Sequence, residues 1–174
     1  MTGVVAALTL PSLTDLLLLA GPCALASLFL LVRATFNRQP PPRWVVVDGS
    51  NVMHWKDGTP LIATLREVVQ RLTEMGFAPA VVFDANAGYK ISGRYQHDGA
   101  LGKLLGLPED RILVVAKGTP ADPKVLAAAR DLGARIVSND RYRDWAEAHP
   151  EVSEPGYLIR GGYRDGALWL DVDG

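Results

Sequence analysis

The sequence predicts an α/β fold in which three layers are built around a parallel central sheet, preceded by one N-terminal transmembrane helix. Three observations indicate this architecture. Short apolar runs of strand length alternate with segments of helical periodicity, which is typical of a parallel sheet covered by helices on both faces. The chain has 174 residues, enough for one domain with its own core. An apolar segment without charge precedes the alternating part.

Residues 1–36 are the predicted membrane anchor, with the helix at about 13–33. No charged residue lies between Asp15 and Arg33, a stretch of roughly 17 residues at the lower limit for a spanning helix. Lysine and arginine occur only from Arg33 onward, so the positive-inside rule predicts a single-pass protein of the cell membrane with a cytoplasmic C-terminal domain. A cleaved signal peptide and an interfacial segment are the alternatives, but the segment lacks a basic start.

Residues 37–43, NRQPPPR, form the predicted linker, because successive prolines favour an extended chain and stop a helix. The soluble domain is expected over 44–174. The net charge of the chain is −1, so no basic surplus indicates a nucleic-acid binder. The only cysteine, Cys23, has no partner for an intramolecular disulfide, and three scattered histidines offer no spacing for a metal site.

The domain opens with a strand at 44–48, WVVVD, because a short apolar run is typical of a strand buried on both faces. Thr59 and Pro60 predict the start of a helix that ends at Gly76. Further strands are predicted from apolar runs at 80–84, 111–116 and 134–140. Further helices are predicted at 99–105, 121–133 and 141–149. The tail, residues 156–172, is expected to form two strands around a turn at or near Arg164-Asp165-Gly166.

Aspartates end three of these strands, namely Asp48, Asp84 and Asp140. The carboxyl ends of parallel strands share one edge of a sheet, so these side chains are expected to face one crevice. Asp122, which opens a helix, joins them if the preceding loop covers that edge. A single aspartate at a strand end is usually a turn or helix cap. Clustered carboxylates, however, repel one another unless a cation neutralises them, and oxygen ligands suit Mg²⁺ or Mn²⁺.

Two motifs resemble a known family. The first is Asp48-Gly49-Ser50-Asn51 at the end of the first strand. The second combines the helix-opening Asp122 with Ser138-Asn139-Asp140 and Tyr142-Arg143-Asp144. Over most of residues 44–146 the chain resembles the NYN branch of the PIN-like nucleases, closest to the Regnase-type ribonuclease domain. This resemblance implies a magnesium-dependent endoribonuclease with a five-stranded parallel core. The chain departs from the pattern because it has one acid, Asp122, where the family has an acidic pair.

The resemblance and the chemistry together assign roles to these residues. Asp48, Asn51, Asp122 and Asp140 are the predicted catalytic residues. Asp48 and Asp140 would hold the metal directly, Asp122 directly or through water, and Asn51 would orient the phosphate or a water. Asp84 is the fourth candidate ligand, with the capping of its own turn as the alternative role.

Cations near the strand ends are the candidates for binding substrate phosphates, although each taken singly is better explained as solvated surface. They are Lys90, Arg94, Lys117, Lys124, Arg141 and Arg143. Trp55 and Tyr89 are suited either to stacking on unpaired bases, which favours single-stranded RNA, or to packing against their own loops. RNA and the membrane are therefore the expected partners, and a homo-oligomer stays open.

The sequence thus predicts a membrane-anchored, metal-dependent endoribonuclease that hydrolyses single-stranded RNA. The main alternative is a non-catalytic RNA-binding domain tethered to the membrane, and a membrane protein with a vestigial domain is a third. A haloacid-type phosphatase is disfavoured, because such enzymes carry a second aspartate two residues after the first and this chain has D-G-S and D-A-N instead.

Overall fold

The computed structural model describes residues 23–33 and 41–173. The chain divides between Pro41 and Pro42 into two units. In the first unit, residues 23–33 are helical. Within the described residues, no helix is long and apolar enough to cross a membrane. The predicted anchor helix at about 13–33 and the linker at 37–43 lie partly outside the described residues, so both stay predictions.

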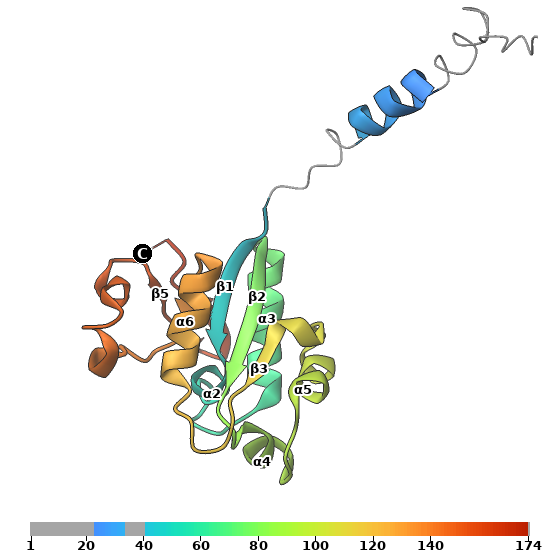
Figure 1. The fold of residues 1–174 in the computed structure, drawn as a ribbon. Helices are drawn as coiled ribbons and strands as arrows, with labels where there is room; N and C mark the ends of the chain where they lie inside the picture. Colours follow the sequence, from blue (N-terminus) through green and yellow to red (C-terminus); the bar gives the residue numbers. More distant parts are fainter. Residues whose placement is uncertain (1–22, 34–40, 174) are drawn as a thin grey trace, which may run out of the picture. The chain divides into compact units, whose positions relative to one another are not determined.

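A five-stranded parallel sheet forms the centre of the second unit, in the order β3-β2-β1-β4-β5 (Figure 1). Its strands are β1 (Arg43–Asp48), β2 (Phe77–Phe83), β3 (Ile112–Val114), β4 (Arg135–Val137) and β5 (Leu158–Ile159). The apolar run of β1 lies between β2 and β4, and its valines are fully buried, as the continuous apolar run predicts. The predicted parallel central sheet is confirmed.

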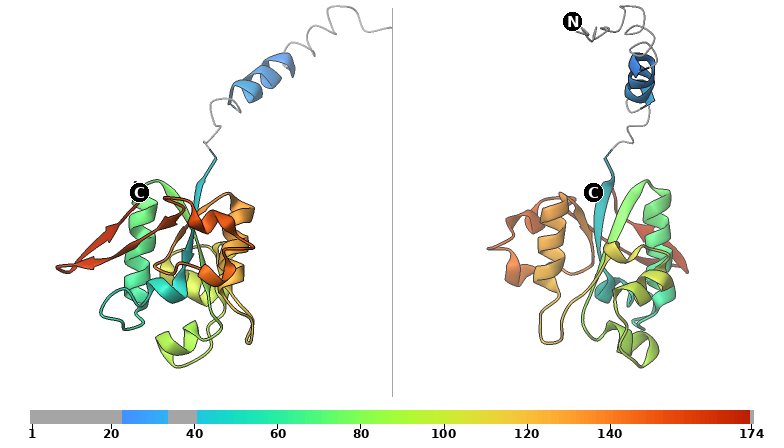
Figure 2. Two further views of the ribbon diagram at one scale, coloured as in Figure 1. Left: turned by 90° about the vertical axis from the view of Figure 1, so that its left-hand side faces the viewer. Right: turned by 45° about the vertical axis from the view of Figure 1, so that its right-hand side comes forward.

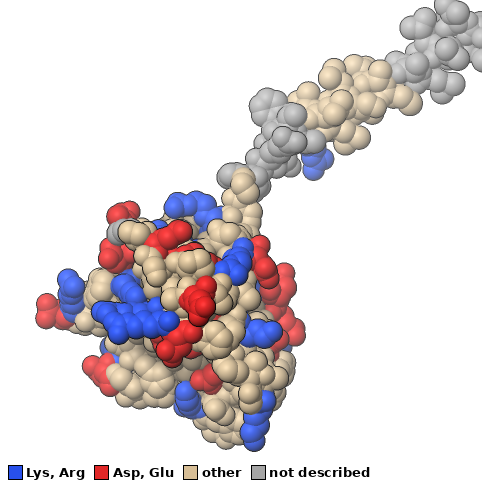
Figure 3. Space-filling view, turned by 60° about the vertical axis from the view of Figure 1, so that its left-hand side comes forward, with Lys and Arg blue, Asp and Glu red and all other residues tan. Residues whose placement is uncertain are grey.

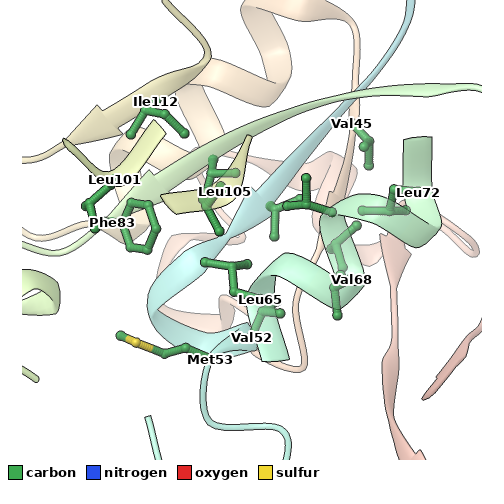
Figure 4. Packing of buried hydrophobic residues seen from close by; sticks show 14 of the residues in the cluster. Val45, Val52, Met53, Leu65, Val68, Leu72, Phe83, Leu101, Leu105 and Ile112 are labelled. Carbon is green, nitrogen blue, oxygen red and sulfur yellow. The ribbon is translucent and has the colours of Figure 1, made fainter. Parts of the chain in front are cut away.

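Helices cover both faces of the sheet and complete the three layers (Figure 2). They are α2 (Gly49–Val52), α3 (Ile62–Glu74), α4 (Ala87–Ser92), α5 (Asp98–Leu105) and α6 (Asp122–Leu132), with short 3₁₀ turns η1 (Glu109–Arg111), η2 (Arg143–Trp145) and η3 (Pro150–Ser153). Successive residues of β1 point to opposite faces, so Val45 and Val47 pack with α3 and α5 whereas Val46 packs with α6. Figure 4 shows Leu65, Val68 and Leu72 in the first of these cores.

Two helices, α3 and α6, end next to glycines, as the sequence predicts. Gly76 after α3 and Gly133 after α6 have φ values of +81° and +57°, which a residue with a side chain adopts only at a cost in energy. The predicted start at Thr59 and Pro60 is two residues early, because α3 begins at Ile62 after Leu61, which makes no side-chain cap.

The predicted helix at 141–149 is wrong. Only the 3₁₀ turn η2 forms there, preceded by Tyr142 at φ +48°. The backbone N–H of Tyr142 donates to Asp140 Oδ1 at 2.7 Å, and the Tyr142 ring is buried in the core on the α6 side. Burial of this ring fixes the segment in a loop and outweighs the helix propensity of its sequence.

The tail forms the predicted hairpin. Strands β6 (Gly161–Arg164) and β7 (Ala167–Leu170) pair antiparallel around Asp165 and Gly166. Both turn residues have positive φ, as a two-residue type I′ turn requires. The first predicted strand of the tail is divided in the structure: Leu158–Ile159 form β5, which pairs with β4 and supplies the fifth strand that the family resemblance implied, and only Gly161–Arg164 join the hairpin.

Candidate active site

A hollow of about 400 Å³ lies at the carboxyl edge of the sheet, where β1, β2 and β4 end and α6 begins. In Figure 1, α2 and the loop before α6 gather at this edge. All four predicted acids line the hollow, together with Ser50, Asn51 and residues 120–121; the acids are Asp48, Asp84, Asp122 and Asp140. The topology therefore brings together residues up to 92 positions apart in the sequence. We call this cavity the acidic hollow.

Asp48 is the most enclosed of the four acids, with 6% of its surface exposed. Its Oδ1 accepts a hydrogen bond from the backbone N–H of Asn51 at 3.1 Å. Its Oδ2 accepts from the hydroxyls of Ser138 at 3.1 Å and Tyr142 at 2.9 Å. Burial raises the pKa of Asp48, and these hydrogen bonds oppose that rise. A carboxylate has about four acceptor positions, so one on Oδ1 stays available for a further partner.

Asp122 and Asp140 form a pair of like charges. Burial, followed by the negative charge of Asp140, raises the pKa of Asp122, while a hydrogen bond from the Trp145 side chain opposes the rise. Asp140 itself is exposed, and its Oδ1 caps the N–H of Tyr142. Because the charge of Asp140 disfavours the ionised form of Asp122, this part of the hollow is suited to a positively charged ligand.

Asp84 takes the capping role. Its Oδ1 accepts from the backbone N–H of Asn86 at 2.7 Å, and its Oδ2 pairs with Lys90 Nζ at 3.1 Å. Its own N–H donates to Ser50 Oγ at 2.7 Å, which ties the ends of β1 and β2 together. Since both carboxylate oxygens already have partners, Asp84 is a weaker candidate ligand than the other three acids.

Asn51 connects two segments that border the hollow. Its Oδ1 accepts from Trp55 Nε1 at 2.9 Å and from the backbone N–H of Asn139 at 3.0 Å, so it links α2 to the end of β4. Among the described residues, no hydrogen bond engages the Nδ2 donors of Asn51, which leaves them for a ligand in the hollow. Trp55 is partly buried and packs against the core, and its role in stacking on a base stays a prediction.

Three residues that the sequence analysis did not assign complete the site. Ser138 and Tyr142 hold Asp48, and the pKa of the Tyr142 phenol is raised far above its usual value by burial and by Asp48, which keeps it a hydrogen-bond donor. Arg160 Nη1 donates to the backbone carbonyls of Ser138 at 3.1 Å and Asp140 at 2.8 Å. Arg160 follows β5 at the same edge, so recognising that strand would have indicated it.

The donor set fits a hard divalent cation held partly through water. Oxygen ligands of carboxylates are the ones that Mg²⁺ and Mn²⁺ prefer. Within the described part of the chain, no three His, Cys, Asp or Glu side chains are placed to hold one ion by direct contact. Mg²⁺ usually keeps several waters and binds through one or two carboxylates, so Asp48, Asp122 and Asp140 fit this mode and not a closed cage.

Comparison with known families assigns the domain. The model of the Zc3h12a-like ribonuclease NYN domain matches residues 41–155, which is more than half of the chain. The chain belongs to this family. The resemblance to a Regnase-type NYN domain of the PIN-like nucleases is therefore confirmed.

Solved structures agree with this NYN domain in fold. Two structures of nuclear protein-only RNase P 2 (PRORP2) from Arabidopsis thaliana superimpose with TM-scores of 0.56 and 0.54, each at 17% identity. The first covers 80% of this chain and 31% of the PRORP2 chain, and the second covers 87% and 35%. At this identity the likeness shows the fold alone, and the chain spans about one third of the length of these structures. No curated protein matches the sequence.

The six predicted substrate cations of the NYN domain are all exposed, and none of these described residues lines the acidic hollow. Lys90 pairs with Asp84, Lys117 lines a neighbouring hollow, and Lys124 lies in the first turn of α6. Arg141 and Arg143 follow β4, and Arg94 follows α4. Figure 3 shows one face of the molecule, where basic and acidic side chains are interspersed. The NYN domain therefore presents scattered cations around an acidic hollow.

The carboxylate pair predicts a specific pH dependence for the stability of the NYN domain. A carboxyl with a raised pKa binds its proton more tightly when folded, so its stabilising effect is complete below its ordinary pKa of 3.8 and is lost as the pH rises through the folded value. Replacing Asp122 by Asn should therefore flatten the decline of the unfolding free energy above about pH 4. Urea unfolding in chelator between about pH 4 and pH 8 measures this, and equal slopes for the two proteins would contradict it.

Proposed function

We propose that residues 42–174 form a metal-dependent endoribonuclease that cleaves single-stranded RNA. The observation that carries the proposal is the acidic hollow, where four carboxylates from three strand ends and one helix start meet in a domain of a ribonuclease family. Asp48, Asp122 and Asp140 are the proposed ligands of Mg²⁺ or Mn²⁺. Asp84 is kept as an outer candidate because it already has partners.

Each side chain of the proposed site has its own role. A bound divalent ion would make a coordinated water more acidic and shield the charge that develops on the phosphate. Asp48 supplies a fixed acceptor, because three hydrogen bonds leave its carboxylate little freedom. Asp140 is exposed and so meets the substrate from the solvent side. Asn51 directs its amide donors to a phosphate oxygen, since Trp55 and Asn139 hold its carbonyl oxygen.

Cleavage of a 5′-labelled single-stranded RNA tests the proposal. The full chain is expected to cut the RNA internally with Mg²⁺ or Mn²⁺ and to stop when a chelator is added. Asp140→Asn is expected to lose most of this activity. Asp131→Asn is its matched control and should keep the activity, because Asp131 is an exposed acid near the end of α6 that does not line the hollow. RNA that is bound but left intact at every metal concentration would overturn the nuclease proposal.

Non-catalytic RNA binding is the second candidate function. The observation that favours it is that, in the described residues, no three acids are placed around a common ion position. Under this function the domain retains RNA equally well with metal and with chelator. The same cleavage experiment, with binding followed in parallel, separates the two candidates.

We also propose that residues 1–36 anchor the domain in the cell membrane with residues 37–174 in the cytoplasm. The support is the charge distribution, because lysine and arginine occur only from Arg33 onward. A reporter fused after Gly174 is expected to show cytoplasmic activity in the membrane fraction. The same fusion without residues 1–36 should leave the membrane fraction, and a reporter active outside the cytoplasm would contradict this topology.

Binding of RNA is expected to depend only weakly on salt. The net charge is −1, and Lys90 is already paired with Asp84, so we expect RNA binding to rest on a few local cations. A plot of log affinity against log salt concentration should correspond to roughly 2–4 phosphate contacts. A slope typical of a strongly basic binder would show that the charged surface acts differently.

A further inference from the structure

A second hollow lies beside the acidic one. Asp84 lines the acidic hollow, and the next two residues, Ala85 and Asn86, line the second. The loop after β3 likewise contributes Lys117 to the second hollow and Pro120 to the acidic hollow. The two cavities are therefore neighbours that share both bordering loops at the carboxyl edge of the sheet, where Figure 1 shows α4.

Two exposed tyrosines line this second hollow, which we call the tyrosine hollow. Tyr89 on α4 is 55% exposed and Tyr95 after α4 is 57% exposed. Neither belongs to the two hydrophobic cores, so the fold does not require their rings. The hollow has a volume of about 570 Å³, in the range of small-molecule sites, and Asn86 and Lys117 add polar groups to its lining.

Close packing and hydrogen bonds fix the segment that carries the two tyrosines. A side chain at Gly88 would place its Cβ 2.5 Å from the backbone nitrogen of Gln96, so α4 and the segment after it touch only because residue 88 is glycine. Ser92 Oγ donates to the carbonyl of Gly88 at 3.0 Å, and Gln96 Nε2 donates to Ser92 Oγ at 2.9 Å. The hollow is thus formed before a ligand arrives, which lowers the cost of ordering on binding.

The chemistry of the tyrosine hollow suits one unpaired nucleotide. Aromatic rings stack on any base, since every base has a flat π face, and an adjacent cation can bind the phosphate. Lys117 lies in the lining, and Lys90 follows Tyr89 on α4 and pairs with Asp84 of the acidic hollow. A base inside a duplex is already stacked and paired, so a site of this kind selects single strands.

We propose that the tyrosine hollow binds one unpaired nucleotide of the RNA, a fixed distance along the strand from the phosphodiester in the acidic hollow. This inference rests on the proposed function and adds to it a site for a base and a reason for single-strand preference. The strand crosses the shared loops, with its base against Tyr89 and Tyr95 and its backbone beside Lys117.

Binding of the full chain to two probes in chelator tests the tyrosine hollow without cleavage. The probes are a short oligouridine and a ribose-phosphate chain of the same length without bases. The parent is expected to prefer oligouridine, and Tyr89→Ala or Tyr95→Ala should weaken its binding by about 5- to 150-fold, while Tyr89→Phe and Tyr95→Phe keep it. The alanine variants should bind the chain without bases as the parent does.

Each other outcome has a definite meaning. If the parent binds both probes equally, or if the alanine variants keep the full preference for oligouridine, the tyrosine hollow is not a base site, and the nuclease proposal still stands on the acidic hollow. If the parent binds oligouridine through the tyrosines but never cleaves RNA with metal present, the base site stands and the nuclease proposal falls. Unchanged binding of the chain without bases shows that an alanine variant is folded, so its loss of oligouridine binding reports on the tyrosine ring itself.

Discussion

Replacing Asp140 by Asn is expected to lower the rate of RNA cleavage by on the order of a hundredfold or more, because ligand geometry and water activation are lost together. The same variant should be at least as stable as the parent without metal. Asparagine keeps an oxygen that can accept from the N–H of Tyr142, and it removes the charge that raises the pKa of Asp122. Activity and stability are therefore expected to move in different directions.

Thermal unfolding with and without Mg²⁺ completes this prediction. Mg²⁺ should raise the melting temperature of the parent by mass action and that of Asp140→Asn much less. Asp140→Ala separates charge from hydrogen bonding, because it also loses the cap on Tyr142 and should cost about 1 kcal/mol relative to Asn. If Asp140→Asn melts clearly lower in chelator and metal shifts neither protein, Asp140 is a cap and not a ligand.

The largest effects on stability are expected where α2 meets β2. Phe83 is fully buried, and Phe83→Ala should cost about 3–5 kcal/mol (Figure 4). A Cβ at Gly49 would lie 2.7 Å from the Phe83 ring and 2.8 Å from Val81, so Gly49→Ala should cost about 1–3 kcal/mol by overpacking. It should also lower cleavage, because α2 carries Asn51 and is capped by Asp48.

A double-mutant cycle tests this contact directly. Gly49→Ala should cost less in the Phe83→Ala background than alone, because the ring that it strikes is gone, and the coupling should exceed about 0.5 kcal/mol. Gly162→Ala is the matched control, since its Cβ would meet nothing closer than 3.4 Å. Additive costs for Gly49→Ala and Phe83→Ala would show that the close approach does not limit the packing.

The sequence indicated the acids of the site because parallel topology makes a simple rule, that residues at strand ends share an edge. It did not indicate the ion pair between Asp84 and Lys90, since this contact depends on the position of α4. The sequence predicts Tyr142 in a helix, because its burial beside Asp48 is a tertiary contact that no local pattern shows. The sequence predicts one strand where the structure has β5 and β6, because no local pattern shows that Leu158 and Ile159 pair with β4.

Asp48 and the two hydroxyl groups that donate to it are synthesised at different times. Asp48 is among the first residues of the domain to leave the ribosome, while its partners Ser138 and Tyr142 follow 90 and 94 positions later. Synthesis proceeds at about 5–20 residues per second, so these hydroxyls follow Asp48 after roughly 5–20 seconds. A nascent chain that carries the D-G-S-N motif alone is therefore an incomplete site, and the domain can complete its acidic hollow only after Ser138, Asp140 and Tyr142 have been added.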